Sequence, residues 1–274
     1  GMARRLGNIG NVYKDQGSYP KALDYYFKAL KVYEELGDKK GIAVAMGNVG
    51  NIHKEQGNYS KALEYYFTTL KMGEELRDKN RIAIQLSNIG TIYNMQKDYP
   101  KALDYYFKAL NIDRELGNKK DIALDICNIG TSYNDQGNYS QALDYYFKAL
   151  KTQEELGDKQ GIAATLGNIG SSYSGQKKYA KALDYESQAV KIANEIGAMD
   201  FEKEFHRMLY DTYRAMGNTV KALEHYEKYV ILKDTVFAQE KQKEIVRKEM
   251  NYEFEKKETA AKSEQEKKDA EAGE

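Results

Sequence analysis

The chain has 274 residues, of which 31% are charged, and its 42 basic residues balance its 42 acidic residues. This balance gives no sequence-wide electrostatic attraction for a nucleic acid or for an anionic membrane surface, so neither is predicted as a partner. The single cysteine, Cys127, excludes an internal disulfide bond.

The two ends of the printed sequence say little about compartment. No signal peptide is recognisable, and no run of about 18 apolar residues predicts a membrane span or a membrane contact. Gly1 before Met2 resembles the residue that a cleaved expression tag leaves behind, so we expect the sequence to be part of a longer protein. A cytoplasmic and an extracytoplasmic location both stay open.

An Asn-Ile-Gly or Asn-Val-Gly motif recurs along the chain at a fixed step of 40 residues, without insertion or deletion. The motif begins at Asn8, Asn48, Asn88, Asn128 and Asn168. A fixed period of roughly 20 to 50 residues is typical of solenoids, in which each unit packs only against its neighbours. We therefore predict a repeat array over residues 3–240, with repeats at 3–40, 41–80, 81–120, 121–160, 161–200 and 201–240.

The second repeat shows the expected local structure. Ile42, Met46 and Val49 recur at three- and four-residue steps, which predicts a first helix. Gly57 follows, where glycine can adopt a positive φ and end that helix. The apolar residues between Tyr59 and Leu70 then repeat the helical spacing. Each repeat is predicted to be a helix, a tight turn and an antiparallel helix.

A glycine lies in the middle of the first helix in five repeats, where it costs about 1 kcal/mol relative to alanine. Its recurrence indicates a packing reason, and we expect the alanines of the second helix to be its partners. The glycines are Gly10, Gly50, Gly90, Gly130 and Gly170, and the alanines are Ala22, Ala62, Ala102, Ala142 and Ala182. The recurrent tyrosines, such as Tyr133 and Tyr146, are predicted to fill the core.

These positions resemble the tetratricopeptide repeat over about 240 residues. The family's usual order of residues is seen at Ile129, Gly130, Tyr133, Gly137, Ala142, Tyr146 and Ala149. The resemblance implies an all-α, right-handed superhelix (an α-solenoid) of six helix-turn-helix repeats. The period of 40 exceeds the family's usual length of about 34, and the proline that normally ends the second helix is absent. This longer variety is similar to the repeats of kinesin light chains, spindle-orientation adaptors and bacterial sensor proteins.

The sixth repeat is degenerate, because Tyr210 replaces the packing glycine and Tyr229 replaces an alanine, as we expect of a cap. Phe237 occupies the position where other repeats have a stopping glycine, so the last helix is predicted to continue. Residues 241–274 are predicted to form a charged C-terminal helix or connector whose end is frayed or disordered. This Glu/Lys-rich segment resembles the connectors of bacterial repeat-containing sensors, in which an output module follows.

The resemblance implies that the first helix of each repeat lines a concave groove. The predicted peptide-binding residues form three rows along it. The first row is Asn8, Asn48, Asn88, Asn128 and Asn168; the second is Asn11, Asn51, Thr91, Thr131 and Ser171; the third includes Lys14, Lys54, Asn94 and Asn134. Asparagine amides offer a donor and an acceptor, so they suit a peptide backbone. Alternatively, they join neighbouring helices inside the solenoid, and both interpretations stay open.

No catalytic residue, cofactor or metal site is predicted. His53, His206 and His225 are expected to form no ligand cluster, no phosphate-binding glycine motif is present, and Cys127 has no base nearby in the sequence. The carboxylate-clamp version of these repeats matches only in part, because small residues replace a clamp lysine. Those residues are Gly7, Gly47 and Gly167.

The sequence thus favours a non-enzymatic protein-interaction module that holds a peptide or protein segment in its groove, as the input region of a bacterial signalling protein. The alternative is a structural scaffold that self-associates as a homodimer through its C-terminal helix. Val246, Met250 and Phe254 are spaced by four residues, which is too short a stripe for a stable coiled coil by itself.

Overall fold

The computed structural model describes the backbone of residues 1–272, and the side chains of residues 1–246 and 248. Within these residues every regular element is a helix. The helices are α1 (Met2–Asp15), α2 (Tyr19–Glu35), α3 (Lys39–Glu55), α4 (Tyr59–Glu75), α5 (Lys79–Met95), α6 (Tyr99–Leu116), α7 (Lys119–Asp135), α8 (Tyr139–Leu156), α9 (Lys159–Gly175), α10 (Tyr179–Glu195), α11 (Met199–Ala215) and α12 (Thr219–Ala272).

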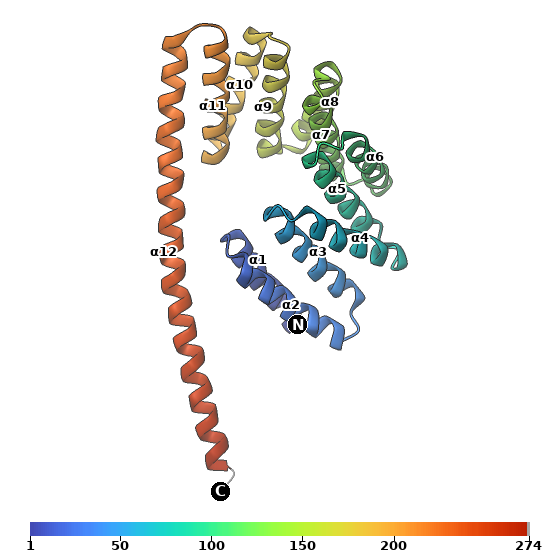
Figure 1. Ribbon diagram of the computed structural model, residues 1–274, viewed down its shortest axis with the longest axis vertical. Helices are drawn as coiled ribbons and strands as arrows, with labels where there is room; N and C mark the ends of the chain where they lie inside the picture. The colour runs from blue at the N-terminus through green and yellow to red at the C-terminus, as the bar shows by residue number, and fades with distance from the viewer. Residues whose placement is uncertain (273–274) are drawn as a thin grey trace.

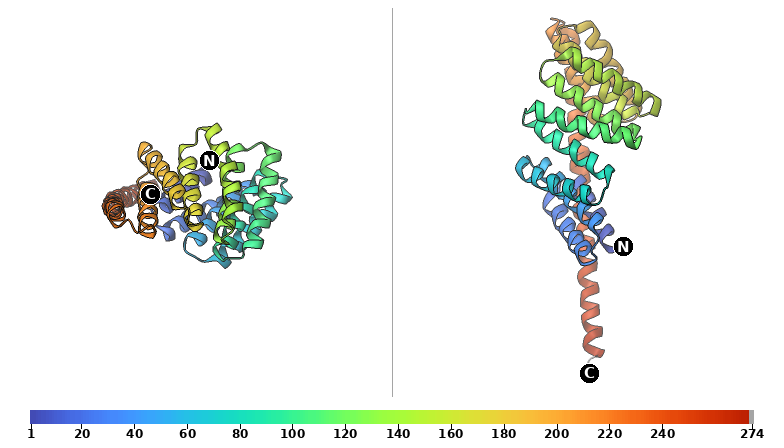
Figure 2. Two further views of the ribbon diagram at one scale, coloured as in Figure 1. Left: turned by 90° about the horizontal axis from the view of Figure 1, so that it is seen from above. Right: turned by 90° about the vertical axis from the view of Figure 1, so that its right-hand side faces the viewer.

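The helices form six antiparallel pairs that stack in chain order, so the predicted all-α solenoid is confirmed. Each helix packs against its neighbours in the chain, and the first helix of one pair also contacts the first helix of the next. The stack curls so that α1 and α2 turn back toward the side on which α12 descends (Figure 1). Figure 2 shows α12 extending well beyond the stacked pairs.

A residue with a positive φ ends the helices at regular steps of twenty residues. At Gly57 (φ 73°) the backbone N–H donates to the carbonyl of Lys54 at 2.9 Å, and the next N–H, of Asn58, donates to His53 at 2.8 Å. These bonds satisfy the last carbonyls of the helix. The predicted role of the glycines in ending the helices is therefore confirmed.

Three of these turns lack glycine, because Arg77 (φ 52°), Lys97 (φ 62°) and Lys177 (φ 59°) occupy the left-handed position. A left-handed residue with a Cβ costs about 1–2 kcal/mol, whereas glycine loses only about 0.5–1 kcal/mol in extra entropy. We therefore expect Lys97→Gly to raise the free energy of unfolding by roughly 0.5–1 kcal/mol. Urea unfolding followed by circular dichroism measures the change.

The matched control is Gly57→Ala, which introduces a Cβ at the same turn position of another repeat (φ 73°). It is expected to shift the unfolding midpoint in the opposite direction. A Lys97→Gly variant that is less stable than the parent would contradict backbone strain at this turn.

In the first four repeats the mid-helix glycine makes room for a tyrosine ring of the second helix in the same repeat, whereas Gly170 of the fifth faces Glu186. A Cβ at Gly130 would lie 2.7 Å from Cε1 of Tyr146 and 3.3 Å from the carbonyl oxygen of Ala142. Gly50 stands in the same relation to Tyr66, at 2.8 Å. The expected packing reason is confirmed, but the nearest partner is the ring, because a fully buried phenol needs more space than the alanine methyl.

The core runs continuously from repeat to repeat. Ala62 and Tyr66 of α4 pack against Ile89 and Ile92 of α5, and all four side chains are fully buried. The tyrosines of the first helices, such as Tyr93 and Tyr133, lie at the edge of this core and are half-buried. Each stacks on a ring of the second helix, as Tyr93 does on Tyr105 with 5.6 Å between the ring centroids. Core packing of the tyrosines is therefore confirmed for both helices of the repeat.

Helix α12 passes Phe237 without a break, which confirms the predicted continuation. The Phe237 side chain is 68% exposed. The predicted fraying of the chain end falls on residues 273–274 and on side chains near the end of the chain that lie outside the described residues. It therefore stays a prediction. Among the described residues, every helix is too short or too polar to cross a bilayer.

Candidate functional site

The three predicted rows lie along the first helices α1, α3, α5, α7 and α9, and all their side chains are exposed or half-buried. Residues three positions apart on a helix share a face, so the rows form one continuous surface across five repeats. Their hydrogen bonds differ from row to row. These bonds decide which side chains remain available to a ligand.

The second row joins the two helices of each repeat. Tyr66 Oη donates to Asn51 Oδ1 at 2.7 Å, and burial raises the pKa of Tyr26 to about 12, so the phenols stay protonated donors at neutral pH. The other pairs are Tyr26–Asn11 at 2.7 Å, Tyr106–Thr91 at 3.1 Å and Tyr146–Thr131 at 3.2 Å. This row supplies the structural connection, and peptide contact by its members stays a prediction.

The third row joins consecutive repeats. Ser132 Oγ donates to Asn94 Oδ1 at 2.6 Å, and Ser172 Oγ donates to Asn134 Oδ1 at 2.7 Å. In the first two repeats lysines take this position, and each pairs with the next residue in the chain. These ion pairs are Lys14–Asp15 at 3.1 Å and Lys54–Glu55 at 3.3 Å. The lysine heads remain at the surface, where a ligand can reach them.

The first row differs, because its central amides make no hydrogen bond to any described residue. The half-buried side chains of Asn48, Asn88 and Asn128 belong to this group, while Asn168 Nδ2 contacts Cys127 Sγ at 3.6 Å. The polar atoms of these amides are not among the buried atoms that lack a partner, so they remain open to solvent. Three such amides, repeated at the same position in consecutive repeats, are therefore available to a ligand.

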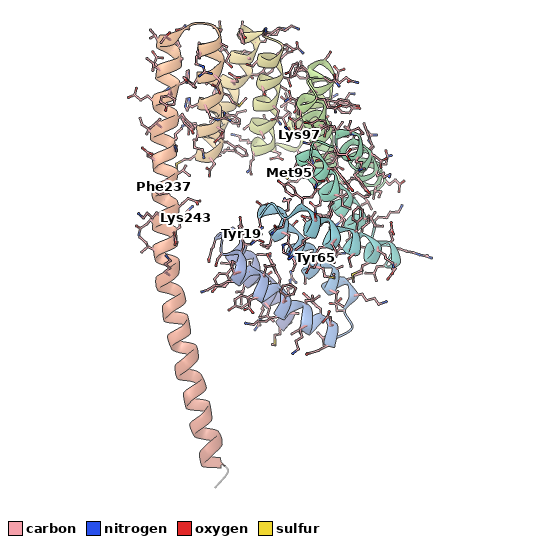
Figure 3. The ribbon with its side chains drawn as sticks, viewed as in Figure 1. Tyr19, Tyr65, Met95, Lys97, Phe237 and Lys243 are labelled. Atoms are coloured by element: carbon pink, nitrogen blue, oxygen red, sulfur yellow. The ribbon has the colours of Figure 1, made fainter. Side chains whose placement is uncertain are left out.

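A polar hollow of about 360 Å³ lies at the N-terminal end of these rows. Its lining includes one amide from each of the first two rows and the two lysines of the third row. The lining residues are Lys14, Tyr19, Asn51, Lys54, Glu55 and Asn88. Figure 3 shows Tyr19 on one side of the open part of the curl, with Lys243 of α12 on the other. This hollow therefore combines hydrogen-bonding side chains with two lysines and one glutamate.

Three acids are buried, Asp113, Asp125 and Glu186, and none was anticipated from the sequence; the last two each leave an oxygen without a partner. Asp125 of α7 is 2% exposed; its Oδ1 accepts from Ser87 Oγ at 2.7 Å, and its Oδ2 has no partner. Burial raises the pKa of Asp125 to about 7. The signal was present in the sequence, because the same position holds uncharged Ala45, Gln85 and Thr165 in other repeats.

The other acid with an unpaired oxygen, Glu186 of α10, takes the place of the buried tyrosines. It is 1% exposed, its Oε1 accepts from Thr212 Oγ1 at 3.0 Å, and its Oε2 has no partner. Burial, with the nearby Asp211 charge, raises the pKa of Glu186 to about 7. The signal in the sequence is the exchange of tyrosine for glutamate at one repeat position.

The two histidines of the last repeat lie side by side, a contact that the sequence did not predict. His206 Nδ1 and His225 Nδ1 are 3.0 Å apart, because α11 and α12 pack as an antiparallel pair. Burial lowers the pKa of His206 to about 4, so this ring is neutral at pH 7. No group of three or more His, Cys, Asp or Glu side chains suited to a metal is found among the described residues.

Cys127 lies half-buried at the junction of two repeats. Its Sγ is 3.7 Å from Thr165 Oγ1, and burial raises the pKa of its thiol. Of the small residues that replace a clamp lysine, Gly167 has a packing role, because a Cβ there would lie 2.4 Å from the Phe205 ring. At Gly47 a Cβ would make only an ordinary contact, 3.6 Å from the Gln85 amide.

The chain was compared with known families and structures. A family model described as tetratricopeptide repeat matches residues 2–75, 42–115, 80–155 and 121–195. No curated protein matches the chain by sequence.

Several solved structures are similar to this fold. BtubC from P. vanneervenii has a TM-score of 0.65 at 19% identity, covering 81% of this chain and 91% of that chain. The apo form of RapI has a TM-score of 0.70 at 20% identity, covering 86% and 85%. A Rap protein complexed with competence and sporulation factor has a TM-score of 0.66 at 17% identity, covering 87% and 76%. At these identities the likeness concerns the fold alone.

Proposed function

The chain belongs to the tetratricopeptide repeat family, and on that premise we propose that it is a non-enzymatic protein-interaction module whose concave groove holds a peptide or an extended protein segment. The ligand runs along the first helices, over the first row of amides. No cofactor takes part in this binding. The observation that carries the proposal is the set of unpaired amides at Asn48, Asn88 and Asn128.

Asparagine is a mediocre residue inside a helix, because its side chain competes for backbone hydrogen bonds. The first row nevertheless keeps it in five consecutive repeats, although its central members bond to nothing in the described structure. A peptide backbone presents a donor and an acceptor at each residue, and an amide can pair with both. A row of amides therefore binds an extended chain without demanding a particular sequence.

The comparisons support binding as a use of this fold, since a Rap protein of similar structure was solved with competence and sporulation factor. We further propose that the array is the input region of a bacterial signalling protein. Helix α12 packs on α11 and then continues as one helix to Ala272. A ligand that changes the packing of the last pair would move the far end of this long helix.

The test replaces Asn48, Asn88 and Asn128 together by alanine. Peptides selected from a random 12-residue display library on the parent protein serve as probes, and fluorescence anisotropy gives their affinities. A hydrogen bond contributes about 0.5–1.5 kcal/mol, so three lost bonds are expected to weaken binding by roughly 10- to 1,000-fold.

The matched control replaces three exposed asparagines outside the rows, Asn58, Asn111 and Asn138, and should bind as the parent does. Circular dichroism verifies that both variants fold. The proposal is wrong if the library yields no binder, or if the first-row variant binds the selected peptides as tightly as the control.

A second candidate function, self-association through α12, is favoured by its exposed apolar side chains. Val220, Leu223, Ile231 and Phe237 are 57–70% exposed. Tyr226 is 46% exposed, whereas Tyr26 at the same repeat position is fully buried by the following helix. Apolar surface of this kind is a common feature of protein interfaces. We propose that a second copy of the chain covers it in a homodimer.

Light scattering after gel filtration distinguishes the two functions. A homodimer gives twice the mass of one chain, and Leu223→Lys with Phe237→Lys is expected to return the mass to that of a monomer. A parent protein that is monomeric at high concentration would exclude the scaffold function and leave the peptide-binding function standing.

A further inference from the structure

The fifth repeat contains a hollow in which the other repeats have a tyrosine ring. In the fourth repeat, Tyr146 fills the space between the helices, and its hydroxyl reaches Thr131. In the fifth repeat the corresponding pair is Glu186 and Ser171. A glutamate side chain is slimmer than a phenol ring, and Ser171 makes no hydrogen bond to any described residue. The exchange therefore leaves unfilled volume on the groove side.

This hollow has a volume of about 380 Å³, within the range of about 300–1,000 Å³ that is usual for small-ligand pockets. Its wall includes side chains of the second and third rows, so it opens onto the predicted groove. The members used below are Asn134, Ser171, Glu186, Arg207, Asp211 and Thr212. The hollow thus adjoins the path of a groove-bound chain.

The carboxylate of Glu186 is buried and only half satisfied. Thr212 Oγ1 donates to its Oε1 at 3.0 Å, whereas its Oε2 has no partner and the residue is 1% exposed. A buried polar atom without a hydrogen bond is unfavourable, and a buried charge without a partner is more so. A ligand group that donates to Oε2 would remove this penalty.

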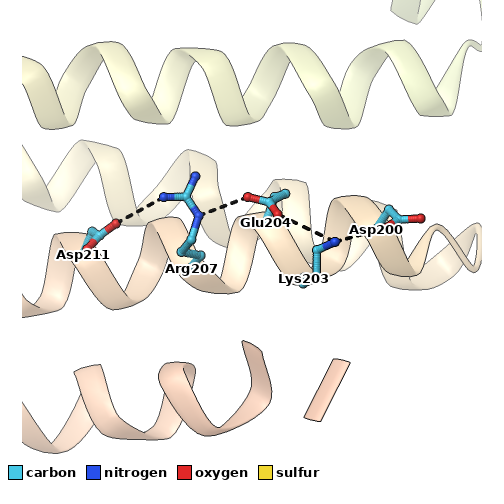
Figure 4. A network of polar contacts seen from close by, with 5 residues as sticks. All are labelled: Asp200, Lys203, Glu204, Arg207 and Asp211. Carbon is cyan, nitrogen blue, oxygen red and sulfur yellow. Dashed lines mark hydrogen bonds and ion pairs between the residues drawn. The ribbon is translucent and has the colours of Figure 1, made fainter. Parts of the chain in front are cut away.

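The charges around the hollow favour a cation. Helix α11 contributes Asp211 and Arg207, and the Arg207 guanidinium is already engaged by two acids, Glu204 at 3.0 Å and Asp211 at 3.8 Å (Figure 4). Helices α7 and α9 contribute the uncharged Asn134, Ser171 and Ser174. Glu186 is therefore an acid that faces the hollow without a cation of its own.

We propose that the hollow at Glu186 is a specificity subsite that takes the side-chain cation of a lysine or arginine in the bound peptide. The ammonium or guanidinium group donates to Glu186 Oε2 and to Ser171 Oγ, and the aliphatic part of the side chain occupies the volume of the missing ring. The inference rests on the proposed peptide-binding function. It adds a preference for one basic residue near the C-terminal end of the groove.

The subsite has a defined pH dependence. Burial and the Asp211 charge raise the pKa of Glu186 to about 7. A cation binds to the carboxylate and not to the neutral acid, so the affinity for a basic side chain rises as the pH rises from 6 to 8. Had the neutral acid donated its proton to a ligand carbonyl, the affinity would fall over the same interval.

The test uses short amidated peptides as probes: acetyl-Gly-Lys-Gly and acetyl-Gly-Arg-Gly, with norleucine and acetyl-lysine in place of lysine as neutral controls. Nuclear magnetic resonance titration, read at the backbone amides of Ser171 and Thr212, gives the affinities. Both basic probes should bind at pH 8 and bind roughly tenfold more weakly at pH 6. The neutral probes should bind at least about tenfold more weakly than the lysine probe at pH 8.

Two variants keep the test independent of folding. Glu186→Gln preserves the shape but removes the charge, and Glu186→Tyr restores the ring of the other repeats and fills the hollow. Both should abolish the pH dependence and weaken the basic probes at least about tenfold. Equal binding of the norleucine and lysine probes, pH-independent binding, or unchanged binding by Glu186→Gln would each overturn the inference.

The result of this subsite test can be distinguished from the result of the groove-binding test with library peptides. If the first-row alanine variant loses the selected library peptides while Glu186→Gln binds the lysine probe as the parent does, the subsite is refuted and the groove function stands. If the lysine probe binds with the expected pH dependence while the library yields no binder, the subsite stands as a lone cation site.

Discussion

Replacing Tyr146 by alanine is expected to lower the free energy of unfolding by about 3–5 kcal/mol, the range typical of buried aromatic residues. The Tyr146 ring is 1% exposed and packs with Ala142, Leu143 and Ile169 across the junction of the fourth and fifth repeats. Truncation leaves a cavity that reaches from Ile169 across the junction to Gly130 of the same repeat, which has no side chain to fill it. Thr131 also loses the hydrogen bond from the phenol.

Urea unfolding measures this effect, with two controls in the same repeat. Tyr146→Phe removes only the hydroxyl and should cost about 0.5–1.5 kcal/mol. Phe147→Ala truncates a neighbouring ring that is 38% exposed, and its loss should be well below that of Tyr146→Ala. Equal losses at positions 146 and 147 would show that the ring does not hold the junction.

Gly130, which faces the Tyr146 ring, allows a second test of the same packing. Gly130→Ala would gain about 1 kcal/mol from helix propensity alone, but its Cβ would lie 2.7 Å from the Tyr146 ring. Overpacking of this kind costs about 1–3 kcal/mol. The net change is therefore expected to be destabilising, and a stabilised variant would contradict the ring–glycine packing.

The second large effect is a pH-dependent loss of stability at Asp125. Its pKa is raised from 3.8 to about 7 because burial penalises the carboxylate. A raised acid pKa means that the folded state binds more protons than the unfolded state between these two values. Stability therefore falls as the pH rises from about 4 to about 7 and is constant above that window. Glu186 adds a loss of the same sign between 4.5 and about 7.

Replacing Asp125 by asparagine removes this effect together with the influence of the neighbouring Asp113 carboxylate on the Asp125 pKa, because the amide stays neutral, and the amide oxygen can still accept from Ser87. The stability of the variant relative to the parent should increase by roughly 4 kcal/mol between pH 4 and pH 8. Thermal and urea unfolding at a series of pH values measure the difference. Asp144→Asn, at an exposed position of α8, is the control and should run parallel to the parent. If the Asp125→Asn curve also runs parallel, the carboxylate is not destabilising.

Much of the candidate site was predictable and part of it was not. The three rows lie on the first helices, as the repeat pattern implied, because a step of three residues along a helix fixes which side chains share a face. Which row lacks hydrogen-bond partners within the chain was not predictable. That depends on whether Tyr66 reaches Asn51 and whether Ser132 reaches Asn94, and a shift of about 1 Å between helices would break either hydrogen bond.

The sequence by itself determined the solenoid. The 40-residue period, the apolar spacing and the turn positions at Gly17, Gly57 and Gly137 are local signals, and local backbone preferences are sufficient to specify helix pairs that stack in order. The absence of a stopping glycine at Phe237 was equally local, and it correctly predicted the continued helix α12.

Only the tertiary structure decided the partners of individual side chains. The contact between His206 and His225, the unpaired oxygen of Asp125 and the hollow beside Glu186 join residues on different helices, 19 to 38 positions apart. Periodicity fixes the direction in which a side chain leaves its helix, but not the distance to the next helix. Hydrogen bonding and desolvation depend on that distance, which only the packed array sets.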